Sequence, residues 1–199
     1  SKPFFLFVCY HEPHEPIASD PRFEKDYPSA DPSYTAYWAN VAQMDASFGR
    51  LMAELDKQKL REDTFVFFTS DNGPARTSFH PHGETDGLRD KKGSLYEGGI
   101  RVPGLLRWPG KVKAGAVEST PISGVDLLPT LCSFTGLKPP ADRHLDGTNF
   151  RGLFSGEKIQ RTQPLYWHFY GARGAHQVAL REGDWKLIAQ MDAPPIKHR

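Results

Sequence analysis

The sequence predicts an α/β fold, in which a largely parallel β-sheet flanked by helices is followed by a small antiparallel sheet. Two apolar runs of strand length, 3–10 and 64–69, enclose a long segment whose apolar residues recur every three or four positions. Strand, helix and strand in this order are typical of parallel strands joined by a right-handed crossover. Near the C-terminal end, short strand-like runs alternate with glycine-containing turns, which is typical of an antiparallel sheet.

The first elements follow from their apolar patterns. The run "PFFLFVCY" (3–10) is continuously apolar, as expected for a strand covered on both faces. Residues 34–58 carry an amphipathic pattern that predicts a long helix, with Ser33 as its N-cap after Pro32. The run "TFVFFT" (64–69) is the second predicted strand. Because the two strands are expected to be parallel, the polar residues that follow each of them should meet at one edge of the sheet.

The second half contains shorter elements. The run "GLLRWP" (104–109) predicts a strand, and "VDLLPTLCSFTG" (125–136) predicts a helix that ends just before Gly136. A linker with one helical turn, at 150–154, comes next. The runs "PLYWHFY", "QVALRE" and "WKLIAQ" are then predicted as antiparallel strands, separated by the turns "GARGAH" and "GD". We therefore expect a main α/β domain over 1–160 and the beginning of a small antiparallel subdomain over 161–199.

The bulk composition limits the possible partners. The chain has 199 residues, of which 38% are hydrophobic, and a formal net charge of +1. This near-balance of charge gives no reason to expect a nucleic acid partner, and no apolar run is long enough to predict a membrane span. Both cysteines, Cys9 and Cys132, lie in apolar runs and are predicted to be buried hydrophobic residues. A disulfide between them is the minor alternative.

The stretch "SDNGP" follows the second predicted strand and suggests a metal site. Carboxylate and amide oxygens, as in Asp71 and Asn72, are hard ligands suited to Ca²⁺ or Mg²⁺. Neighbouring side chains on a straight strand point to opposite faces, so both can reach one ion only at a bend, which Gly73 and Pro74 provide. A simple β-turn explains the same residues, because Asp, Asn, Gly and Pro are common turn formers.

Two further residues could act on an anionic substrate. His14 lies between prolines in "YHEPHEP", where a rigid loop would present its imidazole as a proton donor or an anion contact. Lys92 precedes the glycine-rich "GSLYEGGIRVP" and could place a point charge against an anion. Taken alone, the histidine could be a solvated bystander, and the "RDKK" cluster a solvated surface.

The order and spacing of these motifs closely resemble the sulfatase family over essentially the whole chain. The most specific part is the pairing of D-N-G with "KGSLYEGGIRVP", and "GDWKLI" is similar to the start of the family's small C-terminal domain. The nearest branch is that of arylsulfatases and N-acetylgalactosamine-6-sulfatases. The resemblance implies an alkaline-phosphatase-like, mixed and largely parallel sheet, and an enzyme that hydrolyses sulfate esters of small molecules or glycans.

The resemblance also implies roles for individual residues. Asp71 and Asn72 match two ligands of a Ca²⁺ ion, with Mg²⁺ as the second choice. Lys92 matches a lysine that contacts the sulfate, and His14 matches a histidine that contacts the sulfate near the leaving oxygen. His11, His80 and His82 match no motif position. Family members work mostly in the periplasm, outside the cell or in lysosomes, and the same compartments are expected here.

The chain departs from the family pattern at the nucleophile. Family members carry a cysteine in a C-x-P-S-R context that is oxidised to formylglycine, and neither Cys9 nor Cys132 has that context. The early aspartate pair and the lysine–histidine pair of the family are also absent. The chain therefore resembles the C-terminal part of a sulfatase. Formylglycine is expected in an N-terminal half outside this chain, and the chain alone is expected to be inactive.

Two alternative functions remain open at this point. Related phosphatases, phosphodiesterases and phosphonate hydrolases share the fold. Those with two zinc ions typically have histidine where Asn72 stands, because imidazole suits Zn²⁺ better than an amide oxygen does. Asn72 thus favours a single hard cation, although phosphonate monoester hydrolases fit nearly as well. The other alternative is a catalytically inactive, sulfatase-like binding module.

Overall fold

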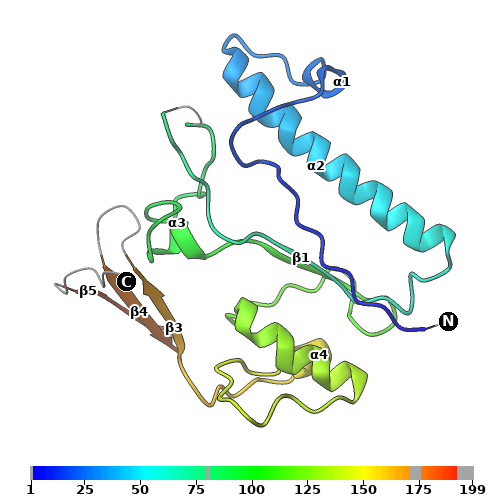
Figure 1. Cartoon of the computed structure of the whole chain (residues 1–199), viewed down its shortest axis with the longest axis vertical. Coiled ribbons are helices and arrows are strands. Elements are labelled where there is room, and N and C mark those ends of the chain that lie inside the picture. The colour runs from blue at the N-terminus through cyan, green and yellow to red at the C-terminus, as the bar shows by residue number, and fades with distance from the viewer. Residues whose placement is uncertain (1, 79–80, 171–175, 192–199) are drawn as a thin grey trace. The chain divides into compact units, whose positions relative to one another are not determined.

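The structure is a computed structural model that describes residues 2–78, 81–170 and 176–191 (Figure 1). It divides into two compact units. The first combines Ser1–Thr64 with Pro74–Asp86, and the second combines Phe65–Gly73 with Gly87–Arg199. The predicted strand 64–69 thus begins at the border between the units, and residues 70–73, which follow it, belong to the second unit.

The first unit is built on one long helix. Helix α2 spans Pro32–Lys57, and the short helix α1 (Pro21–Glu24) packs against it. The N-cap of α2 is Asp31, not the predicted Ser33. The carboxylate of Asp31 accepts a hydrogen bond from the backbone N–H of Ser33, as an N-cap side chain should. Pro32 occupies the first turn, where its missing N–H costs no hydrogen bond.

The predicted strand at 3–10 is not formed, so the predicted parallel pair is not present. Among the described residues, this segment has no assigned strand or helix. Its apolar side chains are exposed, with Phe5 at 76% and Phe7 at 77% of their full exposure. A strand requires a neighbour that pairs with its backbone, and no such ladder involves this segment in the described part of the chain. The apolar composition of residues 3–10 was therefore not enough to predict a strand.

The second unit contains an antiparallel strand pair. Strand β1 (Val66–Thr69) pairs with β2 (Gly104–Arg107), and Val66 lies opposite Arg107. Both strands were predicted, but the parallel direction expected for β1 is not observed. Helix α4 (Leu127–Thr135) follows a 3₁₀ turn, η1 (Gly124–Asp126), and ends at Gly136 as predicted. Gly136 is left-handed, with a φ of 71°, which glycine adopts without strain.

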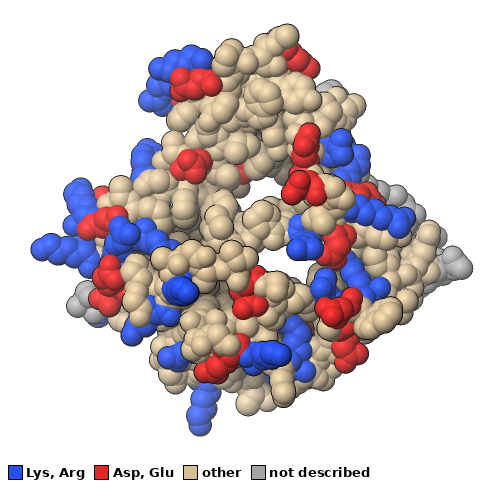
Figure 2. Space-filling view, turned by 180° about the vertical axis from the view of Figure 1, so that it is seen from behind, with Lys and Arg blue, Asp and Glu red and all other residues tan. Residues whose placement is uncertain are grey.

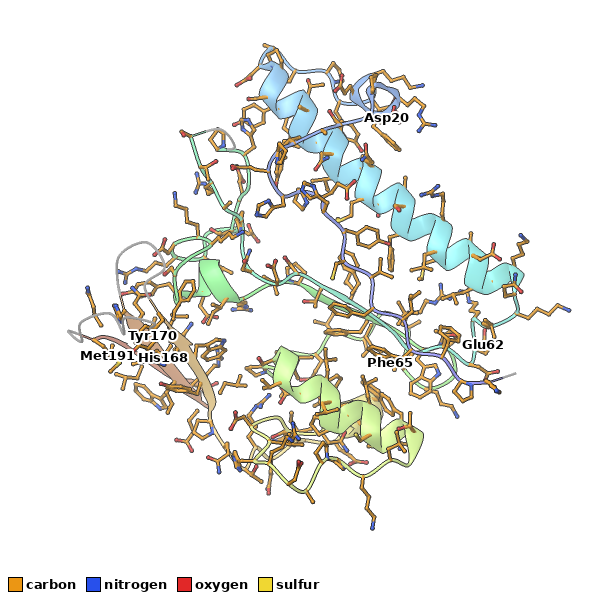
Figure 3. The ribbon with its side chains drawn as sticks, viewed as in Figure 1. Asp20, Glu62, Phe65, His168, Tyr170 and Met191 are labelled. Carbon is orange, nitrogen blue, oxygen red and sulfur yellow. The ribbon has the colours of Figure 1, made fainter. Side chains whose placement is uncertain are left out.

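Half-buried aromatic side chains pack against one another in this second unit. Phe65, labelled in Figure 3, lies 5.1 Å from Phe134 of α4 between ring centroids and 5.7 Å from Trp108. Phe154 lies 5.7 Å from Phe134, and it belongs to the 3₁₀ turn η2 (Arg151–Ser155). These rings join the start of β1, the end of β2, α4 and η2, so the predicted helical turn near residue 150 has a packing role.

The three C-terminal strands form a separate antiparallel sheet, as predicted. Strand β3 (Leu165–Phe169) pairs with β4 (Gln177–Glu182), and β4 pairs with β5 (Trp185–Gln190). The predicted turn "GD" joins β4 to β5, whereas most of the predicted turn "GARGAH" lies outside the described residues. On one face of β3, His168 and Tyr170 lie close together, 4.6 Å apart between ring centroids (Figure 3).

A buried ion pair fixes the connection between α4 and the C-terminal sheet. The Asp126 side chain is fully buried, and its carboxylate accepts hydrogen bonds from the backbone N–H groups of Ser123 and Thr148, both at 2.7 Å. The guanidinium of Arg161 donates to the same carboxylate, with Nη1 at 3.0 Å. The carboxylate thus holds together three segments that are distant in sequence.

We expect the replacement of Arg161 by methionine to lower the free energy of unfolding by about 3–5 kcal/mol, because it leaves a buried carboxylate without its cation. Urea unfolding measures the change. The matched control is Arg143→Met, which breaks an ion pair with Asp142 whose side chains are both mostly exposed and should cost at most about 1 kcal/mol. Equal losses of unfolding free energy in the two variants would show that the buried pair of Asp126 stabilises the fold no more than an exposed pair does.

The two cysteines differ in their burial. Cys132 is buried as predicted, but Cys9 is exposed because it lies in the segment that forms no strand, and both thiols are free.

On the face drawn in Figure 2, basic side chains are interspersed with acidic ones. Within the described ranges, none of the helices combines the length and the apolar character needed to cross a bilayer.

Candidate functional site

The residues after β1 form a tight polar bend. Asp71 is exposed and Asn72 is half-buried. The hydroxyl of Ser70 donates to the carbonyl oxygen of Asn72 at 2.9 Å, and the side-chain amide nitrogen of Asn72 donates to the carbonyl oxygen of Gly73 at 3.0 Å. A carboxamide nitrogen is a hydrogen-bond donor only, so the atom that Asn72 can offer to a cation is its side-chain oxygen.

Gly73 locks this bend against the segment that carries Lys92. The backbone N–H of Gly73 donates to the carbonyl oxygen of Gly99 at 2.9 Å. A Cβ atom on Gly73 would lie 1.9 Å from the carbonyl oxygen of Gly98, far inside any tolerable contact. Only glycine allows this approach of the two backbones, which places the Asp71–Asn72 pair next to the glycine-rich segment.

The segment from Arg89 to Gly99 folds back on itself around Lys92. The backbone N–H of Gly98 donates to the carbonyl oxygen of Arg89 at 2.8 Å, which closes the loop at its base. A Cβ on Gly98 would lie 2.1 Å from the carbonyl oxygen of Asp90, so this closure also requires glycine. Helix α3 (Glu97–Ile100) continues from the loop, and Lys92 is half-buried. These glycines thus allow the backbones of the loop to approach each other closely.

His14 lies in the first unit, in the loop that follows residues 3–10. Its side chain is exposed, and its Nδ1 lies 2.7 Å from the carbonyl oxygen of Glu15. A carbonyl can only accept, so Nδ1 carries the proton in this bond and Nε2 is left for other partners. Asp71 and Lys92 belong to the second unit. The predicted convergence of His14 with Asp71 and Lys92 therefore stays a prediction.

The loop that holds His14 is fastened to α2 by side-chain hydrogen bonds. The carboxylate of Glu12 accepts from the side-chain amide nitrogen of Gln43 at 2.8 Å, and the oxygen of the same amide accepts from the backbone N–H of Asp20 at 3.0 Å. Hydrogen bonds from its own backbone N–H and from Gln43 lower the pKa of Glu12. The carboxylate of Glu15 accepts from the hydroxyl of Thr77.

The other histidines differ in their surroundings. His82 is buried, with its ring 3.7 Å from that of Tyr34 between centroids and its Nε2 2.6 Å from the hydroxyl of Ser33. These contacts give His82 a packing role beside the start of α2. His11 is exposed, with its ring 6.0 Å from that of His14. His80 lies outside the described residues.

Family models match nearly the whole chain. The model described as Sulfatase matches residues 1–137, and the model described as N-sulphoglucosamine sulphohydrolase, C-terminal, matches residues 83–195. The chain belongs to the sulfatase family. This confirms the resemblance inferred from the D-N-G and K-G-x-x-Y-E-G-G motifs.

Two curated relatives of this sulfatase chain illustrate the match. The steryl-sulfatase of Mus musculus is 34% identical over 177 residues, which cover 86% of this chain and 28% of the relative. The N-acetylgalactosamine-6-sulfatase of Canis lupus familiaris is 32% identical over 186 residues, which cover 93% of this chain and 34% of the relative. The chain thus spans about a third of the length of these relatives.

Two solved structures are similar to this chain in sequence and in fold. The crystal structure of Ps i-CgsB superimposes with a TM-score of 0.85 at 33% identity, covering 94% of this chain and 41% of that protein. Ps i-CgsB in complex with k-i-k-neocarrahexaose gives a TM-score of 0.81 at 31% identity, covering 92% and 40%. The sulfatase chain therefore has the fold of the corresponding part of these proteins, which supports the alkaline-phosphatase-like class.

The oxygen donors of Asp71 and Asn72 fit a hard cation but supply only part of its coordination shell. Asp71 and the side-chain oxygen of Asn72 are oxygen donors on one bend, as Ca²⁺ prefers, yet Ca²⁺ takes about six to eight ligands. Over 2–78, 81–170 and 176–191, no group of three or more His, Cys, Asp or Glu side chains is arranged to hold a metal. The calcium ion implied by the resemblance is therefore a proposal, with two ligands from this chain.

Proposed function

We propose that the sulfatase containing this chain hydrolyses sulfate esters, with Asp71, Asn72 and Lys92 in its active site. The observation that carries the proposal is the hydrogen bond from Gly73 to Gly99. It joins the bend that offers two hard oxygen ligands to the loop that offers a fixed cation. A metal site next to a lysine is the arrangement needed to bind a sulfuryl group, whose oxygens carry negative charge before and during cleavage of the ester.

Each residue in this proposal has a distinct duty. Asp71 and the side-chain oxygen of Asn72 hold Ca²⁺, which supplies positive charge to the sulfuryl oxygens when it is bound. Lys92 supplies a second positive charge from a loop closed at Gly98. His14 protonates the leaving oxygen through Nε2, because Nδ1 is held by the carbonyl of Glu15.

The nucleophile is proposed to come from outside this chain. Cys9 stands in "FVCYH" and Cys132 in "TLCSF", and neither sequence has the C-x-P-S-R context from which formylglycine forms in the family. A formylglycine supplied by a more N-terminal part of the complete sulfatase would provide the attacking oxygen. The chain by itself is accordingly proposed to bind parts of the substrate without turning it over.

The substrate class favoured here is a sulfated carbohydrate. The structural neighbour Ps i-CgsB was crystallised with k-i-k-neocarrahexaose, and N-acetylgalactosamine-6-sulfatase is among the relatives. A sugar hydroxyl is a poor leaving group, which gives the proposed proton donor His14 a purpose. From family membership we also propose a periplasmic, secreted or lysosomal location.

The proposal is tested by assaying the complete sulfatase on nitrophenyl esters of sulfate, phosphate and phosphonate. We expect kcat/KM to be highest for the sulfate. A preference for the phosphonate or phosphate would assign the protein to the other hydrolases of this fold. A correctly folded protein that hydrolyses none of the esters, although it binds a sulfated oligosaccharide in calorimetry, would be an inactive binding module.

We expect the replacement of Asp71 by alanine to abolish stabilisation of the complete sulfatase by calcium. A ligand present at 100 times its dissociation constant stabilises the folded state by about 2.7 kcal/mol, so loss of a charged ligand should reduce this gain sharply. The measurement is the Tm with EDTA and with excess Ca²⁺. The control Asp142→Ala removes an exposed carboxylate elsewhere and should keep the calcium response. An undiminished response in Asp71→Ala would remove Asp71 from the metal site.

A further inference from the structure

The carboxylate of Glu97 lies among three cations from two parts of the chain. Its Oε1 accepts from Nζ of Lys186 at 2.6 Å, and its Oε2 lies 3.6 Å from the guanidinium of Arg181 and 4.0 Å from that of Arg101. Lys186 belongs to β5 and Arg181 to β4. Their side chains are only 13% and 25% exposed, and that of Glu97 is 28% exposed. These contacts are therefore stronger than those of ordinary surface pairs.

A second contact joins the same two segments. The backbone N–H of Leu95 donates to the side-chain oxygen of Gln177, the first residue of β4, at 3.3 Å. Lys186 also lies over the ring of Trp167 on β3, 5.6 Å from its centroid. The three-stranded sheet thus holds residues 95–97 through the charged contacts of Lys186 and Arg181 with Glu97 and through one neutral hydrogen bond. The cation of Lys186 is itself held in place by an aromatic ring.

The loop that carries Lys92 is consequently held from two sides. On one side, Gly73 donates to Gly99 and fixes the loop to the bend with Asp71. On the other side, Glu97 fixes it to the C-terminal sheet. Glu97 is five residues after Lys92 in the same closed loop, whose base is the hydrogen bond between Gly98 and Arg89.

We propose that Glu97 is a positioning residue for Lys92, and that the C-terminal sheet acts in catalysis by clamping the Lys92 loop through it. This inference rests on the proposed function of Lys92. A displacement of about 1 Å can cost as much as 10²-fold in rate when a charge must meet developing charge on the substrate. Loss of the Glu97 carboxylate leaves Lys186 and Arg181 without their shared anion, so the loop loses its charged attachment to the sheet while the Gly73 attachment remains.

The test uses the complete sulfatase and the variants Glu97→Gln, Glu97→Asp, Lys186→Met and Glu97→Gln/Lys186→Met. We expect Glu97→Gln to lower kcat on nitrophenyl sulfate about 10-fold and to raise the inhibition constant of inorganic sulfate, because Lys92 contacts both. Glu97→Asp keeps the charge and should recover part of the loss. Since both residues act through one contact, the double variant should lose less than the product of the single losses.

Backbone hydrogen exchange over 89–99 separates positioning from general stability. It should quicken in Glu97→Gln, but not in the control Asp142→Asn, which removes a carboxylate from an exposed pair with Arg143. A lower Tm in Glu97→Gln with kcat, sulfate inhibition and exchange unchanged would overturn the proposal.

If the wild-type sulfatase hydrolyses no sulfate ester, the proposed function fails. The exchange experiment then tests only whether Glu97 attaches the Lys92 loop to the sheet. Unchanged exchange over 89–99 would refute this attachment.

Discussion

Replacement of Lys92 by alanine in the complete sulfatase is expected to lower kcat/KM by about 10²–10³ for every sulfate ester that the enzyme hydrolyses. The reason is that a fixed positive charge next to the sulfuryl oxygens is independent of the leaving group. The charge on these oxygens is already present in the bound ester and is redistributed as the S–O bond breaks. A preorganised cation therefore helps an activated and an unactivated ester to a similar extent.

The matched control for this prediction is the neighbouring residue. Lys91 and Lys92 are both half-buried in the same loop, so Lys91→Ala tests whether any loss of positive charge there reduces the rate. We expect Lys91→Ala to remain within about tenfold of wild type, since no role in sulfate contact is assigned to it. Equal losses for the two variants, or a Lys92→Ala loss confined to one ester, would contradict the direct contact of Lys92 with the sulfate.

Local sequence signals predicted α2, α4 and the C-terminal strands well, whereas the four-residue helices α1 and α3 were not predicted. Apolar periodicity located α2 within two residues of its observed bounds, and Gly136 marked the end of α4. The turn between β4 and β5 at Gly183 has a φ of 54°, which explains why glycine marked it correctly. Such features depend on residues close in sequence, so a pattern of residue types suffices to find them.

Strand pairing was harder to predict because it depends on distant residues. The apolar runs 3–10 and 64–69 indicated two strands, and the first of them indicated coverage on both faces. An apolar pattern does not say which neighbour a strand has or in which direction it runs. In the structure, β1 pairs antiparallel with β2, and residues 3–10 form no strand. The prediction that Cys9 is buried failed for the same reason, whereas Cys132 was placed correctly by its helix.

In the candidate site, too, features that depend on nearby residues were predicted, and contacts between distant residues were not. Asp71, Asn72 and Lys92 were predicted as site residues from local motifs, and their role stays a prediction. The glycines beside them explain how their two segments meet. Glu97, which we propose as a positioning residue, was not predicted from the sequence, although it stands in the same motif. Its partner Lys186 lies 89 positions later, and nothing in the local sequence of either residue indicates the other. The contact of Glu97 with the C-terminal sheet is therefore visible only in the structure.

The expected effect of replacing His14 by alanine depends on the leaving group. An unactivated sugar alkoxide needs a proton as it departs, and general acid catalysis is worth about 10²–10⁴ in rate. Nitrophenolate departs without much help. In the His14 loop, Nδ1 donates to the carbonyl of Glu15, so Nε2 is the atom proposed to protonate the leaving oxygen. His14→Ala should therefore slow a sugar sulfate far more than nitrophenyl sulfate.

The measurement is kcat/KM for His14→Ala and Lys92→Ala on a sugar sulfate and on nitrophenyl sulfate. Lys92→Ala should damage both reactions alike, whereas His14→Ala should damage mainly the first. His11→Ala is the matched control, because His11 is an exposed histidine in the same loop with its ring 6.0 Å from that of His14. If His14→Ala slowed both esters equally, His14 would be an anchor for the sulfate group, and the proton on the leaving oxygen would have to come from another residue.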